Sequence, residues 1–433
     1  MATVIDAIIK LQDDMSDKLK AVNSNLKKTD RMAKATSKSI SNMGKNFDKA
    51  ASKLQPFAAA AIGTATLAVN AFAEFDTKHH AMLNKLDVET RKSADISKQA
   101  FTDMSLTVAK SAEDLVGIAN SLGGAIDGLS GNQLNKMTQE VAKFAIATDT
   151  ASDVASEMVS NTVNAFKLPA EEVPKLLDAI TAASNYSSAD VKDLGEALSK
   201  CSASASGMNQ NIYDTSAALA VLANAGVKGS EAGTGLSNIF EKMANPKNAE
   251  VFTNIGVQVF DAQGKMRSLV DIAEDFNNKT KNMGDAEKQY LAIQAFGDVG
   301  ARAFNKLAGN AEAYRKQQQQ IRDSQGAMNA AYDEMNQSLG VNLQLAKNSG
   351  MAILYKIGEK LAPQVKEIAD YLTEFAKKVT QADDGTLDWV ISIGKVVVGL
   401  FAFLKVASTT MSIVSAIAAN MKTLRAVFSL IQV

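Results

Sequence analysis

Apolar residues recur at heptad spacing along the first 54 residues of the chain. Two positions of the repeat carry no charged side chain, whereas Lys and Asp crowd the other positions. This pattern is typical of a coiled coil, with the apolar seam residues Ile8, Met15, Leu19, Val22, Leu26, Ile40, Met43, Phe47 and Leu54. We predict a long N-terminal coiled-coil helix over residues 1–55 that self-associates. The alternative is a single amphipathic helix that packs on the next domain.

Residues 54–73 contain no charge, and a stretch of about 20 apolar residues can span a membrane. The stretch is rich in Ala, however, and includes Thr64, Thr66 and Asn70. We therefore favour a buried helix over residues 56–79.

Residues 80–316 show short helical patterns and are predicted to form one compact helical domain. Side chains that can accept a hydrogen bond from a helix N-terminus precede several of these patterns, and we expect caps at Ser111, Ser130, Thr150 and Ser188. Asp214 is expected to cap a helix that starts at Thr215 and ends at Gly226.

The next helix is expected to begin at a Ser230 cap and contains two glycines, Gly233 and Gly235. Each glycine inside a helix costs about 1 kcal/mol relative to Ala, so we expect another backbone to lie close to both. Residues 256–260 then alternate apolar and polar side chains, residues 261–264 read as a turn, and a second strand can start at Lys265. The fold class is therefore all-α, mainly helical, with one small β-hairpin.

Three regions follow the hairpin. The polar run 314–325 is predicted to be a solvated helix. It leads into an extended helical segment over residues 317–384, and Pro363 is expected to interrupt that segment. Residues 385–433 are strongly apolar and predict hydrophobic C-terminal helices. We favour membrane insertion of these helices over an apolar helix sheltered inside an oligomer.

Three sequence blocks in register resemble one protein family. They are AALAVLANAGVKGSEAGTGL at 217–236, IGVQVFDAQGKMRSLVDI at 255–272 and AIQAFGDVGARAFNKL at 292–307. Together they look like the core region of phage tail tape measure proteins. The positions that carry this motif are Leu219, Leu222, Gly226, Gly229, Gly233, Gly235, Phe260, Gly264, Phe296 and Gly297.

The resemblance implies a structural protein of a long-tailed phage, a prophage or a phage-tail-like particle, which lies in the tail tube lumen and sets tail length. It implies assembly in the bacterial cytoplasm with tail tube protein, tail assembly chaperones and tail tip or baseplate proteins, as a homo-oligomer that meets the host membrane on ejection. Members of the family are generally longer, so we expect that this chain either ends within its apolar run or is part of a longer one. The rival interpretation is a membrane-inserting helical effector resembling a pore-forming toxin.

Composition and candidate chemistry argue against an enzyme. The 46 Lys and Arg residues nearly balance the 47 Asp and Glu residues, which gives no indication of sequence-specific nucleic-acid binding. A single cysteine excludes an intramolecular disulfide, and the adjacent pair His79 and His80 cannot chelate one metal ion well. The glycine-rich residues 229–235 lack the Gly-Lys-Ser/Thr ending of a phosphate-binding loop. We predict no catalytic residue, no cofactor and no metal.

Overall fold

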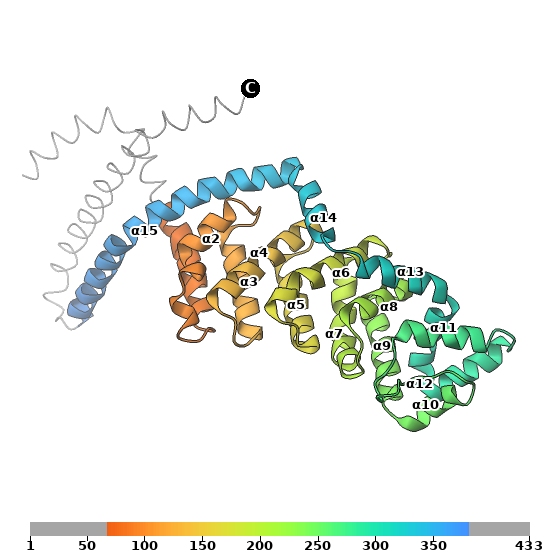
Figure 1. Ribbon diagram of the computed structural model, residues 1–433. Helices are drawn as coiled ribbons and strands as arrows, with labels where there is room; N and C mark the ends of the chain where they lie inside the picture. The colour runs from red at the N-terminus through yellow and green to blue at the C-terminus, as the bar shows by residue number, and fades with distance from the viewer. Residues whose placement is uncertain (1–66, 381–433) are drawn as a thin grey trace, which may run out of the picture. The chain divides into compact units, whose positions relative to one another are not determined.

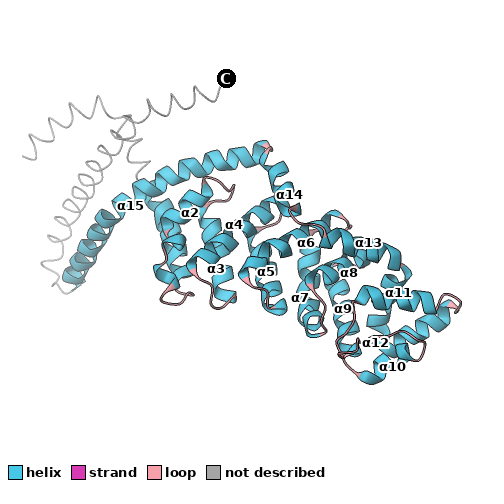
Figure 2. Ribbon diagram, viewed as in Figure 1, coloured by secondary structure: helices cyan, strands magenta, loops and turns pink. Residues whose placement is uncertain are grey.

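The computed structural model describes residues 67–380. Residues 70–358 form one compact unit. The coiled-coil seam predicted within residues 1–55 and the apolar helices predicted over residues 385–433 lie outside the described residues. Within them, the chain is helical almost throughout, which confirms the mainly helical, all-α prediction (Figure 2).

The described chain begins with helical residues 67–83 and three short 3-10 helices occur at Thr90–Lys92, Ala94–Ile96 and Ala170–Glu172. The remaining helices are α2 (Lys98–Ser105), α3 (Ala112–Ala125), α4 (Gly131–Ala147), α5 (Ser152–Phe166), α6 (Val173–Asn185), α7 (Val191–Gly207), α8 (Ile212–Asn224), α9 (Gly229–Met243), α10 (Pro246–Thr253), α11 (Leu269–Lys279), α12 (Asp285–Gly309), α13 (Ala311–Arg322), α14 (Ala327–Asn336) and α15 (Leu339–Thr380).

The helices of the compact unit pack in rows. Helices α3, α5, α7, α9 and α12 follow one another in the first row, and α4, α6 and α8 form the second (Figure 1). After α12 the chain turns back: α13 packs on α8 and α6, and α14 packs on α6 and α4. We call α13, α14 and the part of α15 within the compact unit the return helices.

Of the first four caps predicted along the chain, two are confirmed. Ser111 accepts the Asp114 N–H, and Ser130 forms a capping box with Gln133. The predictions at Thr150 and Ser188 are wrong. Helix α5 begins after Ala151 without a side-chain cap, and Asp190 caps α7 because its carboxylate reaches the Asp193 N–H at 2.7 Å.

The predicted β-hairpin is wrong. The turn at residues 261–264 is present, but residues 256–268 hold one isolated antiparallel bridge, between Phe260 and Met266, and the described chain contains no strand. The Asp261 carboxylate accepts the Gln263 and Lys265 N–H groups and so closes the turn locally. The alternation in this stretch reflects burial of Val257 and Val259 in the helical core.

Two further findings concern the long helices. Helix α15 continues through Pro363, which corrects the predicted interruption. Among residues 67–380, no helix has the length and apolar character needed to cross a membrane. The described part of the uncharged stretch is helical, and Ala68 and Phe72 are buried.

Candidate functional site: a polar clasp on the motif region

A buried carboxylate near the start of α8 organises the site. Helix α8 begins at Ile212 and not at Thr215, because Asn211 Oδ1 accepts the Asp214 N–H at 2.9 Å and acts as the cap. The prediction that Asp214 caps this helix is therefore wrong. Its side chain instead points inward and is 5% exposed.

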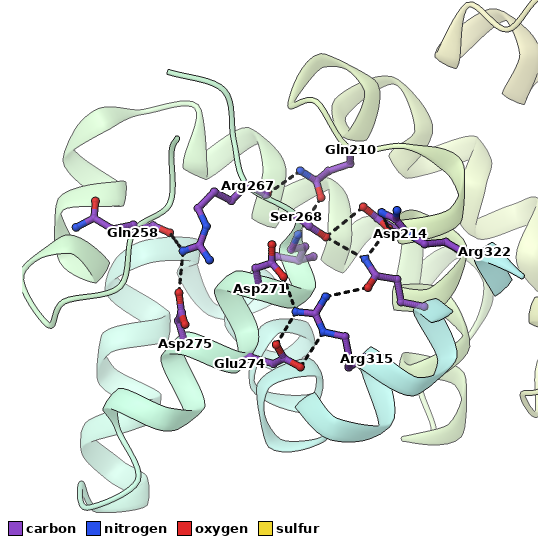
Figure 3. A network of polar contacts seen from close by, with 12 residues as sticks. Gln210, Asp214, Gln258, Arg267, Ser268, Asp271, Glu274, Asp275, Arg315 and Arg322 are labelled. Carbon is purple, nitrogen blue, oxygen red and sulfur yellow. Dashed lines mark hydrogen bonds and ion pairs between the residues drawn. The ribbon is translucent and has the colours of Figure 1, made fainter. Parts of the chain in front are cut away.

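Asp214 receives hydrogen bonds from three parts of the chain (Figure 3). Its Oδ1 accepts from Gln318 Nε2 at 2.7 Å and from Arg322 Nη2 at 2.8 Å, both on α13. Its Oδ2 accepts from Ser268 Oγ at 3.1 Å and Asn211 Nδ2 at 3.1 Å. A buried carboxylate needs such partners because water is excluded from it. Asp214 thus fastens α13 and the start of α11 to α8.

Arg315 makes a second group of contacts on α13. Its Nε donates to Glu274 Oε1 at 2.9 Å and its Nη1 to Gln318 Oε1 at 3.0 Å, and its Nη2 also pairs with Asp271 and Glu274. The hydrogen bonds to Glu274 raise the pKa of Arg315 above its usual value. The guanidinium joins α13 to α11 and is connected to Asp214 through Gln318 (Figure 3).

The loop before α11 is tied to the same region. Gln210 Nε2 donates to Arg267 O at 3.0 Å, and its Oε1 accepts the Leu269 N–H at 2.9 Å. Arg267 Nη1 donates to Gln258 O at 2.8 Å and to Asp275 Oδ2 at 2.7 Å. We call this connected set the polar clasp; its members are Gln210, Asp214, Arg267, Ser268, Asp271, Glu274, Arg315, Gln318 and Arg322.

The predicted solvated helix over residues 314–325 is wrong. Tyr314 and Ile321 are fully buried, and Gln317 and Gln318 are buried with them. Complete burial raises the pKa of Tyr314 well above its usual value, and its hydroxyl donates to Asp214 O at 3.3 Å. Residues 314, 317, 318 and 321 have the spacing of one helix face, which is the sequence signal for this burial.

The motif residues fall in two structural groups. Leu219 and Leu222 are buried in α8, and Phe296 packs against Phe252 and Phe304 with ring centroids 5.2 Å and 4.7 Å away. Phe260 is half-buried at the isolated bridge. A positive φ, which favours glycine, occurs at Gly226, Gly229, Gly264 and Gly297.

The two glycines within α9 lie against neighbouring helices, and the predicted close backbone is present at Gly233 but not at Gly235. A Cβ on Gly233 would overlap Ala197 O of α7, and a Cβ on Gly235 would lie 2.7 Å from Ala303 Cβ of α12. The close backbone is at Gly233, and the close neighbour of Gly235 is a side chain. The predicted cap at Ser230 is wrong, because α9 already begins at Gly229 without a side-chain cap.

The candidate reactive side chains have structural surroundings. His79 is buried with Nε2 2.8 Å from Ile96 O, whereas His80 is exposed with Nε2 3.6 Å from Asp76 Oδ1. Burial raises the pKa of the Cys201 thiol to about 12. Within residues 67–380, no group of His, Cys, Asp and Glu is arranged to hold a metal ion. The clasp itself binds one helix to another.

Comparison with known proteins gives matches to the region that contains the α8 and α11 part of the clasp. A family model described as phage-related minor tail protein matches residues 98–297. The tape measure protein of Pneumococcus phage Dp-1 is 23% identical over 272 residues, which cover 62% of this chain and 24% of that protein. The probable tape measure protein of Escherichia phage P2 is 22% identical over 306 residues, which cover 69% of this chain and 36% of that protein. The core of this chain matches the phage-related minor tail protein family and is similar to the tape measure proteins of two phages.

The tape measure core, residues 98–297, lies inside the compact unit and contains the first two motif blocks. The chain spans about a quarter and about a third of the length of these two relatives. No solved structure matches the chain. The polar clasp joins the end of the tape measure core to α13, which follows it.

Proposed function

We propose that this protein is a tail tape measure protein that sets the length of the tail tube in a long-tailed phage, a prophage or a phage-tail-like particle. The observation that carries the proposal is the family match over the tape measure core. A helix has a fixed rise of about 1.5 Å per residue, so the length of a helical segment can set how many rings of tube protein stack. This role requires no catalysis.

The five predicted parts of the chain have different roles in this proposal. Residues 1–55 gather several copies as a coiled coil, and residues 56–79 connect it to the core over 80–316. Of the predicted extended segment 317–384, only the residues after 358 lie along the tube lumen, because residues up to 358 belong to the compact unit. The apolar residues 385–433 contact tail tip or baseplate proteins and then the host membrane during ejection. The tube protein and tail assembly chaperones are the expected partners during assembly in the host cytoplasm.

The structure indicates where a length test has to be made. Residues up to 358 of α15 belong to the compact unit, whereas the same helix continues outside it to Thr380. An in-frame deletion of residues 359–380 therefore removes helix and leaves residues 70–358 intact. We expect tails shortened by roughly 33 Å, and tails lengthened by the same amount when the segment is duplicated, as measured by electron microscopy. Unchanged tail lengths in both variants would refute the proposal that this chain sets tail length.

A further inference from the structure

The first and last helices of the compact unit contact each other directly. The Phe75 ring stacks on the Tyr355 ring of α15, with centroids 4.7 Å apart and planes at 24°. Both residues are buried, and the Tyr355 hydroxyl donates to Glu113 Oε1 at 3.2 Å. Burial, assisted by Glu113, raises the pKa of Tyr355, so the hydroxyl keeps its proton as a donor. Nearly the whole unit lies between these two residues in sequence.

Polar side chains continue this closure along the return helices. Asn348 on α15 is 2% exposed, and its Nδ2 donates to Ser105 O and Lys110 O at 2.8 Å each. Asp178 on α6 accepts the Gly326 and Met328 N–H groups at 2.9 Å each and so caps α14 from a distant helix. The return helices are therefore held to earlier parts of the unit at several points, at α6 through Asp178 and near its beginning through Asn348.

We propose that residues 70–358 add nothing to tail length while the compact unit is folded. We call such a unit length-neutral. This inference rests on the proposed function. Fully helical and extended, these residues would span roughly 430 Å. In the folded unit, the chain enters and leaves through helices that touch at Phe75 and Tyr355. Tail length then depends on the helical residues outside the unit only.

Helix α15 lies partly within the compact unit and partly in the residues that follow it. The helix runs without interruption from Leu339, inside the unit, to Thr380. The residue count of the ruler starts directly after the closing contact.

The test compares the same helical insertion of about 40 residues at three positions. Two lie at exposed turns inside the unit, between Asp127 and Gly128 and between Ala262 and Gln263, where loop insertions are tolerated. The third follows Thr380. We expect tails longer by roughly 60 Å only for the third insertion. If the internal insertions lengthen the tails as much as the insertion after Thr380 does, the proposal that the folded unit adds nothing to tail length is overturned.

The controls separate this inference from the ruler itself. If the insertion after Thr380 leaves tail length unchanged, the proposal that this chain sets tail length is refuted. The inference about the compact unit, which rests on that proposal, is then refuted as well. Circular dichroism of the purified variants reports whether the unit folds. If both internal variants are folded but give no tails, the inference is also overturned, because a length-neutral unit would accommodate these insertions.

Discussion

The tape measure core and the return helices are held in different ways. Helices α7, α9 and α12 pack through small and apolar side chains, with Gly233 against the α7 backbone and Gly235 against Ala303. The return helices use polar side chains that reach across the unit, at Asp214, Asp178 and Asn348. Close apolar packing resists added volume, whereas a buried polar contact depends on both partners. The two regions should therefore fail under different substitutions.

The largest effect is expected in the tape measure core. Gly233→Leu forces side-chain atoms into the α7 backbone and should lower the free energy of unfolding by about 3 kcal/mol or more. Gly117→Ala in α3 is the control, because nothing lies within 4 Å of its added Cβ. The control should gain up to about 1 kcal/mol from helix propensity. Urea denaturation measures both, and equal stabilities would contradict the close packing at Gly233.

In the polar clasp, Asp214→Ala should cost about 2 kcal/mol in urea denaturation. The substitution leaves Gln318 and Ser268 without their acceptor. Arg322 can form hydrogen bonds with water instead, because its side chain is 45% exposed. The matched control is Asp275→Asn, at an ion pair with Arg267 that lies nearer the surface. The control should lose less than about 1 kcal/mol. A similar loss in both variants would show that the buried position of Asp214 is unimportant.

At the closing end of the return helices, Asn348→Ala should cost about 1 kcal/mol. It removes the donor to the Ser105 and Lys110 carbonyls. Asn342→Ala is the control, because Asn342 is exposed on the same helix and its side chain donates to the Asn336 and Ser338 carbonyls just before that helix, so this variant should change little. Hydrogen exchange of α15 measures the effect locally. Faster exchange in the Asn342 variant than in the Asn348 variant would contradict this assignment.

The smallest effect is expected at His79, next to Phe75. Because Ile96 O can only accept, Nε2 carries the hydrogen, and buried Nδ1 has no partner within the described structure. Burial lowers the pKa of His79 below 6.5. The folded state thus disfavours the charged form, so the stability is complete above pH 6.5 and declines as the pH falls toward the lowered pKa.

A pH series of urea denaturation for His79→Gln tests this prediction. The amide keeps a donor for Ile96 O without titrating in this range, so the decline below pH 6.5 should become shallower. His80→Gln is the control, since His80 is exposed, and should keep the decline. An unchanged pH profile in the His79 variant would assign the acid sensitivity to other groups.

Local signals in the sequence predicted much of the helical core. Ser111 and Ser130 cap helices because a cap needs only residues a few positions away. The sequence likewise predicts Gly226 as a left-handed helix end and Gly233 as a site of close backbone approach, and the structure shows a positive φ at the first and a close backbone at the second. Such features depend on neighbours along the chain.

The polar clasp could not be predicted in the same way. Asp214 is 104 residues from Gln318 and 108 from Arg322, and nothing in the local pattern pairs them. The glutamines of α13 are typical of a solvated helix, yet they satisfy buried groups of other helices. The alternation at Val257 and Val259 indicated a strand for a related reason, because burial by surrounding helices gives the same pattern as pairing.

The most direct test of the account is the distance between the ends of the compact unit in assembled tails. Dyes are attached at Asn70→Cys and Ser349→Cys, both exposed, while the native Cys201 is buried. We predict efficient energy transfer between the dyes in the free protein and in finished tails alike, because in the proposed function the unit stays closed while residues outside it set tail length. Loss of transfer on assembly would mean that the two ends of the unit separate and that residues 70–358 open, which would contradict the account.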